Sequence, residues 1–169
     1  MKENKMKKTK IYAAYGSNLN HAQMRGRCPD AKYLGSAMLQ NQNLLFCGQP
    51  DHSFATIESM EGKEVPIGLW EISARDEKAL DRYEGYPNFY HKTVLPAMLD
   101  GEEVHAMVYI MDLAMPAGLP SVMYYAIVEK GYRDCGLDTE YLKEALKTSM
   151  ERVYSLTPMQ EMSPGMEML

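Results

Sequence analysis

The chain has 169 residues, of which 46% are hydrophobic; this suffices for one domain with its own core and excludes disorder throughout. The formal net charge is −5 at pH 7 and the isoelectric point is near 5.4, which argues against a nucleic-acid-binding protein. The three cysteines contain no CxxC spacing, and with the four histidines they form no ligand pattern, so we expect no metal site.

The first two thirds of the chain are predicted to be mainly β-structure. Residues 11–15 (IYAAY) are apolar and β-prone, and they end abruptly at Gly16 before a short helix over residues 20–27. Further strands are expected, in chain order, at residues 32–47 (one bent strand or two), 54–58 and 65–72, with a turn at Glu61-Gly62-Lys63 between the last two.

Helices and a hairpin follow. Ser73 to Asp76 is an S-x-x-D pattern that predicts a helix start, and Gly85 supplies its stop. The strand-like residues 90–98 and 104–111 flank an Asp-Gly turn, which predicts a hairpin. Two further helices are expected at the end of the domain, with Ser121 and Asp138 as their N-caps. The whole indicates an α+β fold, with a mixed, largely antiparallel sheet that closes on itself and helices packed around it.

The domain is expected to cover residues 1–154. Residues 155–169 combine prolines, a glycine and several methionines without periodicity, so they are predicted to form a loosely ordered tail. Free thiols suit a reducing compartment, and no apolar run has the length of a signal peptide or a membrane span. We therefore expect a cytoplasmic protein without a membrane partner.

Gly16-Ser17-Asn18 is the first candidate site. A strand that stops in small and polar residues exposes backbone N–H groups at its carboxyl end, and such groups suit an anion or a carbonyl oxygen. The residues match neither a P-loop nor a dinucleotide fingerprint, and Ser17 is not in a G-x-S-x-G elbow. No cofactor is therefore implied. Taken alone, the cluster is better explained as an ordinary turn.

Glu84 is the second candidate. If the helix from Ser73 reaches this residue, Glu84 lies one turn after Leu80 on the same face, which turns it toward the interior among several aromatic residues. It also lies at the carboxyl end of the helix, where the dipole disfavours negative charge. Burial and dipole both raise the pKa of a carboxyl group, which would make Glu84 a useful base at neutral pH. The alternative is a structural role, in which Glu84 forms an ion pair with an arginine or caps a turn.

Together these stretches resemble the γ-glutamylcyclotransferase family, which includes the γ-glutamylamine cyclotransferases and the plant AIG2-like proteins. The resemblance rests on YGSNL (15–19), LDRYEG (80–85), the segment ATIESMEGKEVPIGLWEIS (55–73) and the helical segment from Pro120 to Leu146. It implies a small mixed β-barrel flanked by helices, with the active cavity at one end. It also implies Glu84 as the catalytic residue and the following substrate-binding residues: Tyr15, Gly16, Ser17, Asn18, Leu19 and Tyr124.

The activity implied by the resemblance is an intramolecular acyl transfer, formally a carbon–nitrogen lyase reaction. The α-amine of a γ-glutamyl amino acid or dipeptide attacks its own γ-carbonyl, forms 5-oxoproline and expels the attached amine, as in glutathione metabolism. Two other functions stay open: a γ-glutamylamine cyclotransferase, in which the leaving group is an amine, and a non-catalytic metabolite-binding protein on the same fold. A homodimer is also left open.

Overall fold

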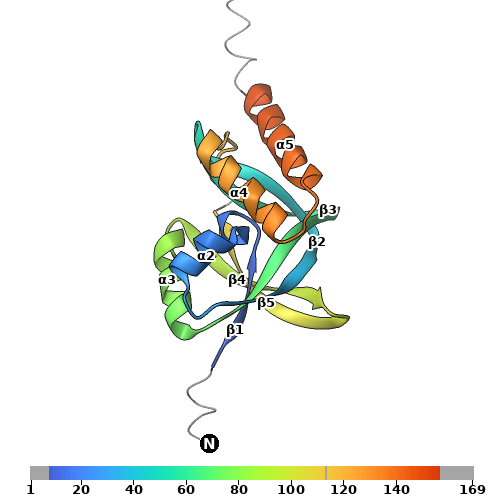
Figure 1. Cartoon of the computed structure of the whole chain (residues 1–169). Coiled ribbons are helices and arrows are strands. Elements are labelled where there is room, and N and C mark those ends of the chain that lie inside the picture. The colour runs from blue at the N-terminus through green and yellow to red at the C-terminus, as the bar shows by residue number, and fades with distance from the viewer. Residues whose placement is uncertain (1–7, 113, 157–169) are drawn as a thin grey trace, which may run out of the picture.

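The computed structural model describes residues 8–112 and 114–156 (Figure 1). No helix within these ranges is long and apolar enough to cross a membrane. The elements in chain order are β1 (Lys10–Ala14), the 3-10 turn η1 (Ser17–Leu19), α2 (His21–Arg27), β2 (Lys32–Gln49), β3 (His52–Ile72), α3 (Ala74–Glu84), β4 (Tyr90–Leu99), β5 (Glu102–Met111), α4 (Val122–Asp134) and α5 (Glu140–Leu156).

The strands form one five-stranded sheet in the order β2-β3-β1-β5-β4. All neighbouring strands are antiparallel except β1 and β5, which run parallel. The sheet is open in its hydrogen bonding but strongly curled, because its two edge strands β2 and β4 lie against each other. The predicted α+β class with a mixed, largely antiparallel, barrel-like sheet is therefore confirmed.

The turn predicted at residues 61–63 is wrong, because β3 runs through it as a single strand. The partner strand β2 is irregular at the same level: Gln40 pairs with Glu64, whereas Gln42 pairs with Ser59. Gly62 has a φ of 83°, and its N–H donates to the side chain of Asn41. The glycine therefore marks a bulge within a long hairpin, and the pairing with β2 continues on both sides of it.

Local capping signals locate the helix ends as predicted. Ser73 and Asp76 form a reciprocal capping box at the start of α3, and Gly85 ends that helix with a φ of 65°. Ser121 caps α4 by accepting from the N–H of Tyr124. At the other end of the domain, α5 extends to Leu156, two residues past the expected domain boundary at 154. The remaining predicted tail, 157–169, lies outside the described residues.

Helix α4 packs directly on the turn that follows β1. Gly131 permits this approach: a Cβ atom added there would lie 2.5 Å from the backbone nitrogen of Asn20 and 2.7 Å from the carbonyl carbon of Leu19. The side chain of Leu19 is itself fully buried. The absence of a side chain at Gly131 therefore determines how closely α4 holds the Gly16–Asn20 segment.

We expect Gly131→Ala to lower the free energy of unfolding by about 1–3 kcal/mol, because backbone atoms would have to move to admit the methyl group. Gly26→Ala is a matched control: Gly26 is also helical, but nothing lies within 4 Å of an added Cβ. The control should be neutral or stabilising by up to about 1 kcal/mol. Urea denaturation of both variants measures the difference, and equal effects would contradict the close-packing argument.

Candidate active site

One cavity of about 140 Å³ brings the two candidate segments together. The turn after β1 forms one part of its wall and the end of α3 another, with the remainder supplied by β1, β3, the start of β4 with the residue before it, β5 and α4. The lining residues are Tyr12, Ala13, Tyr15, Gly16, Ser17, Asn18, Phe54, Ala55, Tyr83, Glu84, Phe89, Tyr90, Tyr109 and Tyr124. Six of the seven predicted site residues are in this lining, and Leu19 is not.

The side chains of the loop bind other protein groups. Ser17 Oγ lies 3.0 Å from Tyr83 Oη, and the amide of Asn18 donates to Tyr12 Oη at 3.0 Å. The backbone is different. Within the described residues, no acceptor receives a hydrogen bond from the N–H groups of Gly16, Ser17 and Asn18. These N–H groups are the donors that the loop can offer to a ligand.

Gly16 and Leu19 have structural roles in the same turn. A Cβ on Gly16 would lie 3.1 Å from Tyr124 Oη and 3.4 Å from the Cβ of Ala55, so the glycine lets α4 and β3 close over the loop. Leu19 points away from the cavity toward Gly68 and α4, and its N–H donates to the carbonyl of Gly16. The position of Leu19 therefore does not support its expected contact with substrate.

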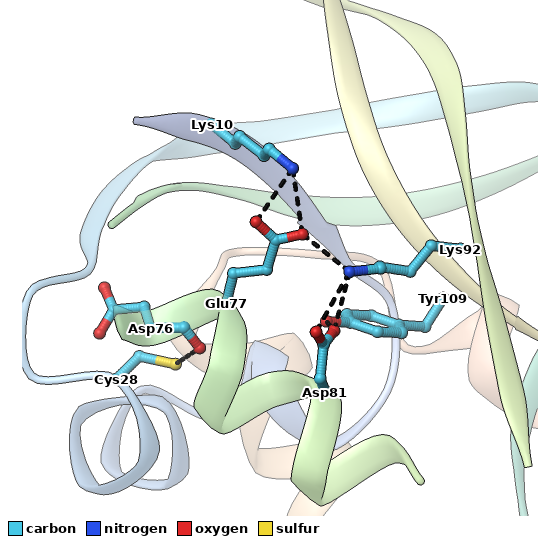
Figure 2. Close-up of polar contacts among 7 residues, drawn as sticks. All are labelled: Lys10, Cys28, Asp76, Glu77, Asp81, Lys92 and Tyr109. Carbon is cyan, nitrogen blue, oxygen red and sulfur yellow. Dashed lines mark hydrogen bonds and ion pairs between the residues drawn. The ribbon is translucent and has the colours of Figure 1, made fainter. Parts of the chain in front are cut away.

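Helix α3 carries three acidic residues on one face: Glu77, Asp81 and Glu84 follow one another at the i, i+4, i+7 spacing. Figure 2 shows how the first two are held. Lys92 on β4 reaches both Glu77 (2.8 Å) and Asp81 (3.0 Å), and Lys10 on β1 also pairs with Glu77. The face that Glu84 shares is therefore fixed against the sheet.

Tyr109 completes this network. Its hydroxyl donates to Asp81 at 2.6 Å, while its ring lines the cavity. Burial acts to raise the pKa of Glu77, but hydrogen bonds from Lys92 and Lys10 hold that pKa below its usual value. These first two carboxylates are thus compensated charges that attach α3 to the strands.

Glu84 differs from both. Within the parts of the chain that the structure describes, its carboxylate has neither a hydrogen-bond donor within bonding distance nor an ion-pair partner. Burial raises the pKa of Glu84 to about 7, and the charge of Arg27 acts in the opposite direction. Glu84 is half-buried, so the expectation of an inward-facing, weakly acidic Glu84 agrees with the geometry, and the alternative of a direct ion pair with arginine does not.

Tyrosines surround this carboxyl group. Burial raises the pKa of Tyr12 and Tyr15, and the negative charge of Glu84 raises it further. The hydroxyls of Tyr90 and Tyr124 bind the two backbone polar groups of Ala55: Tyr90 donates to the carbonyl at 2.7 Å, and the N–H donates to Tyr124 at 3.1 Å. These phenols stay neutral at physiological pH, so they shape a polar but uncharged cavity around Glu84.

Arg27 is a residue that the sequence interpretation missed. Its guanidinium donates to Asn18 Oδ1 and to Gln23 Oε1, each at 2.6 Å, and it lies 3.5 Å from the centre of the Tyr83 ring. It thus links the loop, α2 and the end of α3. The basic residue at the end of α2 was visible as a helix-end charge, but its partners come from tertiary packing.

The described residues include no group of three or more His, Cys, Asp or Glu side chains placed to hold a metal.

Comparison with known proteins agrees with this architecture. Residues 12–130 match the family model described as "Gamma-glutamyl cyclotransferase, AIG2-like". The chain is 32% identical over 146 residues to the human protein named gamma-glutamylcyclotransferase, covering 81% of this chain and 77% of that protein, and 30% identical over 148 residues to the mouse protein of the same name, covering 82% and 78%.

Solved structures give the same result. One named gamma-glutamyl cyclotransferase superposes with a TM-score of 0.74 at 26% identity, covering 82% of this chain and 86% of that one. YkqA from Bacillus subtilis superposes with a TM-score of 0.71 at 22% identity, covering 88% of this chain and 56% of that one, which shows a shared fold. The match over residues 12–130, which includes both the Gly16 loop and Glu84, places this chain in the gamma-glutamyl cyclotransferase, AIG2-like family.

Proposed function

We propose that this protein converts γ-glutamyl amino acids or dipeptides into 5-oxoproline and a free amino acid or amine. The observation that carries the proposal is the position of Glu84. Within the described residues its carboxyl group is unpaired, its pKa is near 7, and it lines a small cavity together with a loop whose N–H donors have no acceptor there. The names of the relatives, which share about 30% of their residues with this chain, support a cyclotransferase.

The reaction needs the substrate in a curled conformation. The α-nitrogen must approach the γ-carbonyl carbon of the same molecule to close a five-membered ring, so the cavity contributes mainly by holding a curled conformer. The N–H groups of Gly16, Ser17 and Asn18 are suited to donate hydrogen bonds to the γ-carbonyl oxygen as negative charge develops on it. Neutral tyrosine hydroxyls, such as those of Tyr12 and Tyr124, border the same space.

Proton transfer is the role of Glu84. The α-ammonium of the substrate cannot attack, so the Glu84 carboxylate first takes a proton from it. The nitrogen then forms the new C–N bond, and the protonated Glu84 gives its proton to the leaving nitrogen as the original amide C–N bond breaks. The regenerated carboxylate removes the second proton from the attacking nitrogen, which becomes the lactam nitrogen of 5-oxoproline, and this proton passes to the released amine. A carboxyl group with a pKa near 7 is both a base and an acid at neutral pH, which suits one residue acting in both steps.

The same chemistry admits an amine instead of an amino acid as the leaving group. A binding protein without turnover would have no use for an uncompensated buried carboxyl group. A panel of γ-glutamyl amino acids, dipeptides and amines, assayed for 5-oxoproline, separates the three functions. Release from amino-acid conjugates supports the proposal, release from amine conjugates alone supports the second function, and no release from any conjugate contradicts both.

We expect Glu84→Gln to lower turnover by about a hundred- to ten-thousandfold, because the amide cannot accept a proton from the ammonium group. The folded-state pKa of Glu84, about 7, is above its unfolded value near 4.3, so the stability contributed by its neutral form is lost as pH rises through 7. Glu84→Gln should therefore be more stable than the parent at pH 8, by up to roughly 3–4 kcal/mol, and equal to it at pH 4.

Asp81→Asn is the matched control for that variant. Asp81 lies one turn earlier on the same helix face but is paired with Lys92 and Tyr109, so its neutralisation should destabilise the fold at pH 8. Denaturation curves at pH 4 and pH 8, measured together with 5-oxoproline release, test both variants. A folded Glu84→Gln enzyme with near-parental turnover would remove Glu84 from the mechanism.

Arg27→Met should move the acidic limb of the kcat/KM profile to higher pH, by about one unit or less. The Arg27 charge lowers the pKa of Glu84, so its removal makes the base harder to ionise. Arg27→Lys keeps the charge but not the bonds to both Asn18 and Gln23, so it separates electrostatics from loop placement. An equal shift of the acidic limb of the kcat/KM profile in both variants would show that the placement of the loop, and not the charge of Arg27, causes the shift.

A further inference from the structure

The cavity is too small to enclose a whole γ-glutamyl conjugate. Its volume of about 140 Å³ is below the range of roughly 300–1,000 Å³ usual for pockets that bury a drug-sized ligand. If the γ-glutamyl group occupies the space beside Glu84 and the Gly16 loop, the group attached to the γ-carbonyl extends outward. The residues at the mouth of the cavity then contact the leaving group.

Two aromatic residues form that mouth. Among the lining residues, Phe54 and Tyr83 are the most exposed, at 39% and 44%, while the others are buried or half-buried. Phe54 is held edge-on by the rings of Phe89 and Tyr124, with centroid separations of 6.1 and 5.1 Å. Exposed rings that are fixed in place at a cavity mouth are the expected form of an apolar contact surface for a ligand.

Tyr83 is equally constrained. Arg27 covers its ring at 3.5 Å, and its hydroxyl is bonded to Ser17. Arg27 itself is outside the cavity lining, which leaves Glu84 as the lining residue with an ionisable carboxyl or basic group. Glu84 is engaged with the α-amine of the substrate, so a charged leaving-group side chain would meet two aromatic rings and no further charged group in the lining, whereas an apolar one would bury surface against the rings.

We propose that Phe54 and Tyr83 form a subsite for an apolar side chain on the leaving group, so that conjugates of aliphatic and aromatic amino acids or amines are preferred over those of charged ones. This proposal rests on the proposed function, because it assigns the outer part of the same substrate. It makes Phe54 a specificity-determining residue, since its ring contacts the leaving group without taking part in proton transfer.

The test compares γ-glutamyl conjugates of glycine, leucine, phenylalanine, glutamate and lysine with the full chain. We expect kcat/KM for the leucine and phenylalanine conjugates to exceed that for the glycine conjugate by roughly tenfold or more, with the glutamate conjugate lowest. Phe54→Ala should reduce the leucine-to-glycine ratio by about tenfold. Phe54→Glu should widen the difference between the lysine and glutamate conjugates, in favour of lysine.

Leu34→Ala is the matched control. Leu34 is an apolar residue of similar exposure, 36%, on β2 and outside the cavity lining, so its replacement should leave all substrate ratios unchanged. Equal kcat/KM values across the five conjugates, or ratios that are the same in Phe54→Ala and the parent, would overturn the subsite while leaving the cyclotransferase activity in place.

Calorimetric binding of the same conjugates separates the subsite from the proposed function. If no conjugate yields 5-oxoproline but the leucine and phenylalanine conjugates bind more tightly, and Phe54→Ala removes that difference, the activity is refuted and the subsite stands. If neither turnover nor binding discriminates between apolar and charged conjugates, the subsite is refuted independently of the chemistry.

Discussion

Lys92 forms ion pairs with two of the three carboxylates on one face of α3, and the charge of the third, Glu84, is not compensated by it. Its ammonium group bridges Glu77 and Asp81, and Lys10 and Tyr109 complete the set of partners. These contacts join the helix to β1, β4 and β5 and fix its rotation about its own axis. Glu84 lies on the same face one turn further along, beyond the reach of that compensation, and so it faces the cavity as an unpaired acid.

The surroundings of Glu84 are polar without being charged, and this combination determines its chemistry. A direct cationic partner would hold the carboxylate ionised and make it a weak base. Here the nearby positive charge, that of Arg27, is shared with Asn18, Gln23 and the ring of Tyr83, and it only moderates the effect of burial. The neutral phenols provide hydrogen-bonding groups while leaving the pKa in the range where proton transfer is reversible.

Signals carried by neighbouring residues were enough to predict the capped helices: Ser73, Gly85 and Ser121 act within a few residues of where they occur. The continuity of β3 was not predictable in this way, because it depends on pairing with β2 across the bulge at Gly62. Likewise, the inward direction of Glu84 follows from helix spacing, whereas the partners of Lys92 and Arg27 depend on the tertiary fold. Leu19 was assigned with its motif, yet its position serves packing against α4.

The structure also explains why the YGSNL segment has this composition. Gly16 leaves room for the hydroxyl of Tyr124, Ser17 bonds Tyr83, Asn18 joins Tyr12 to Arg27, and Leu19 lies under α4. Tyr124 and Gly131 are seven residues apart on one face of α4, so the same helix face closes over both ends of the turn. Each residue of the motif after Tyr15 therefore helps to hold the backbone in place. The backbone N–H groups of the turn remain available for a ligand. All of these contacts together fix the direction of the N–H groups, and no single side-chain replacement in the turn removes them.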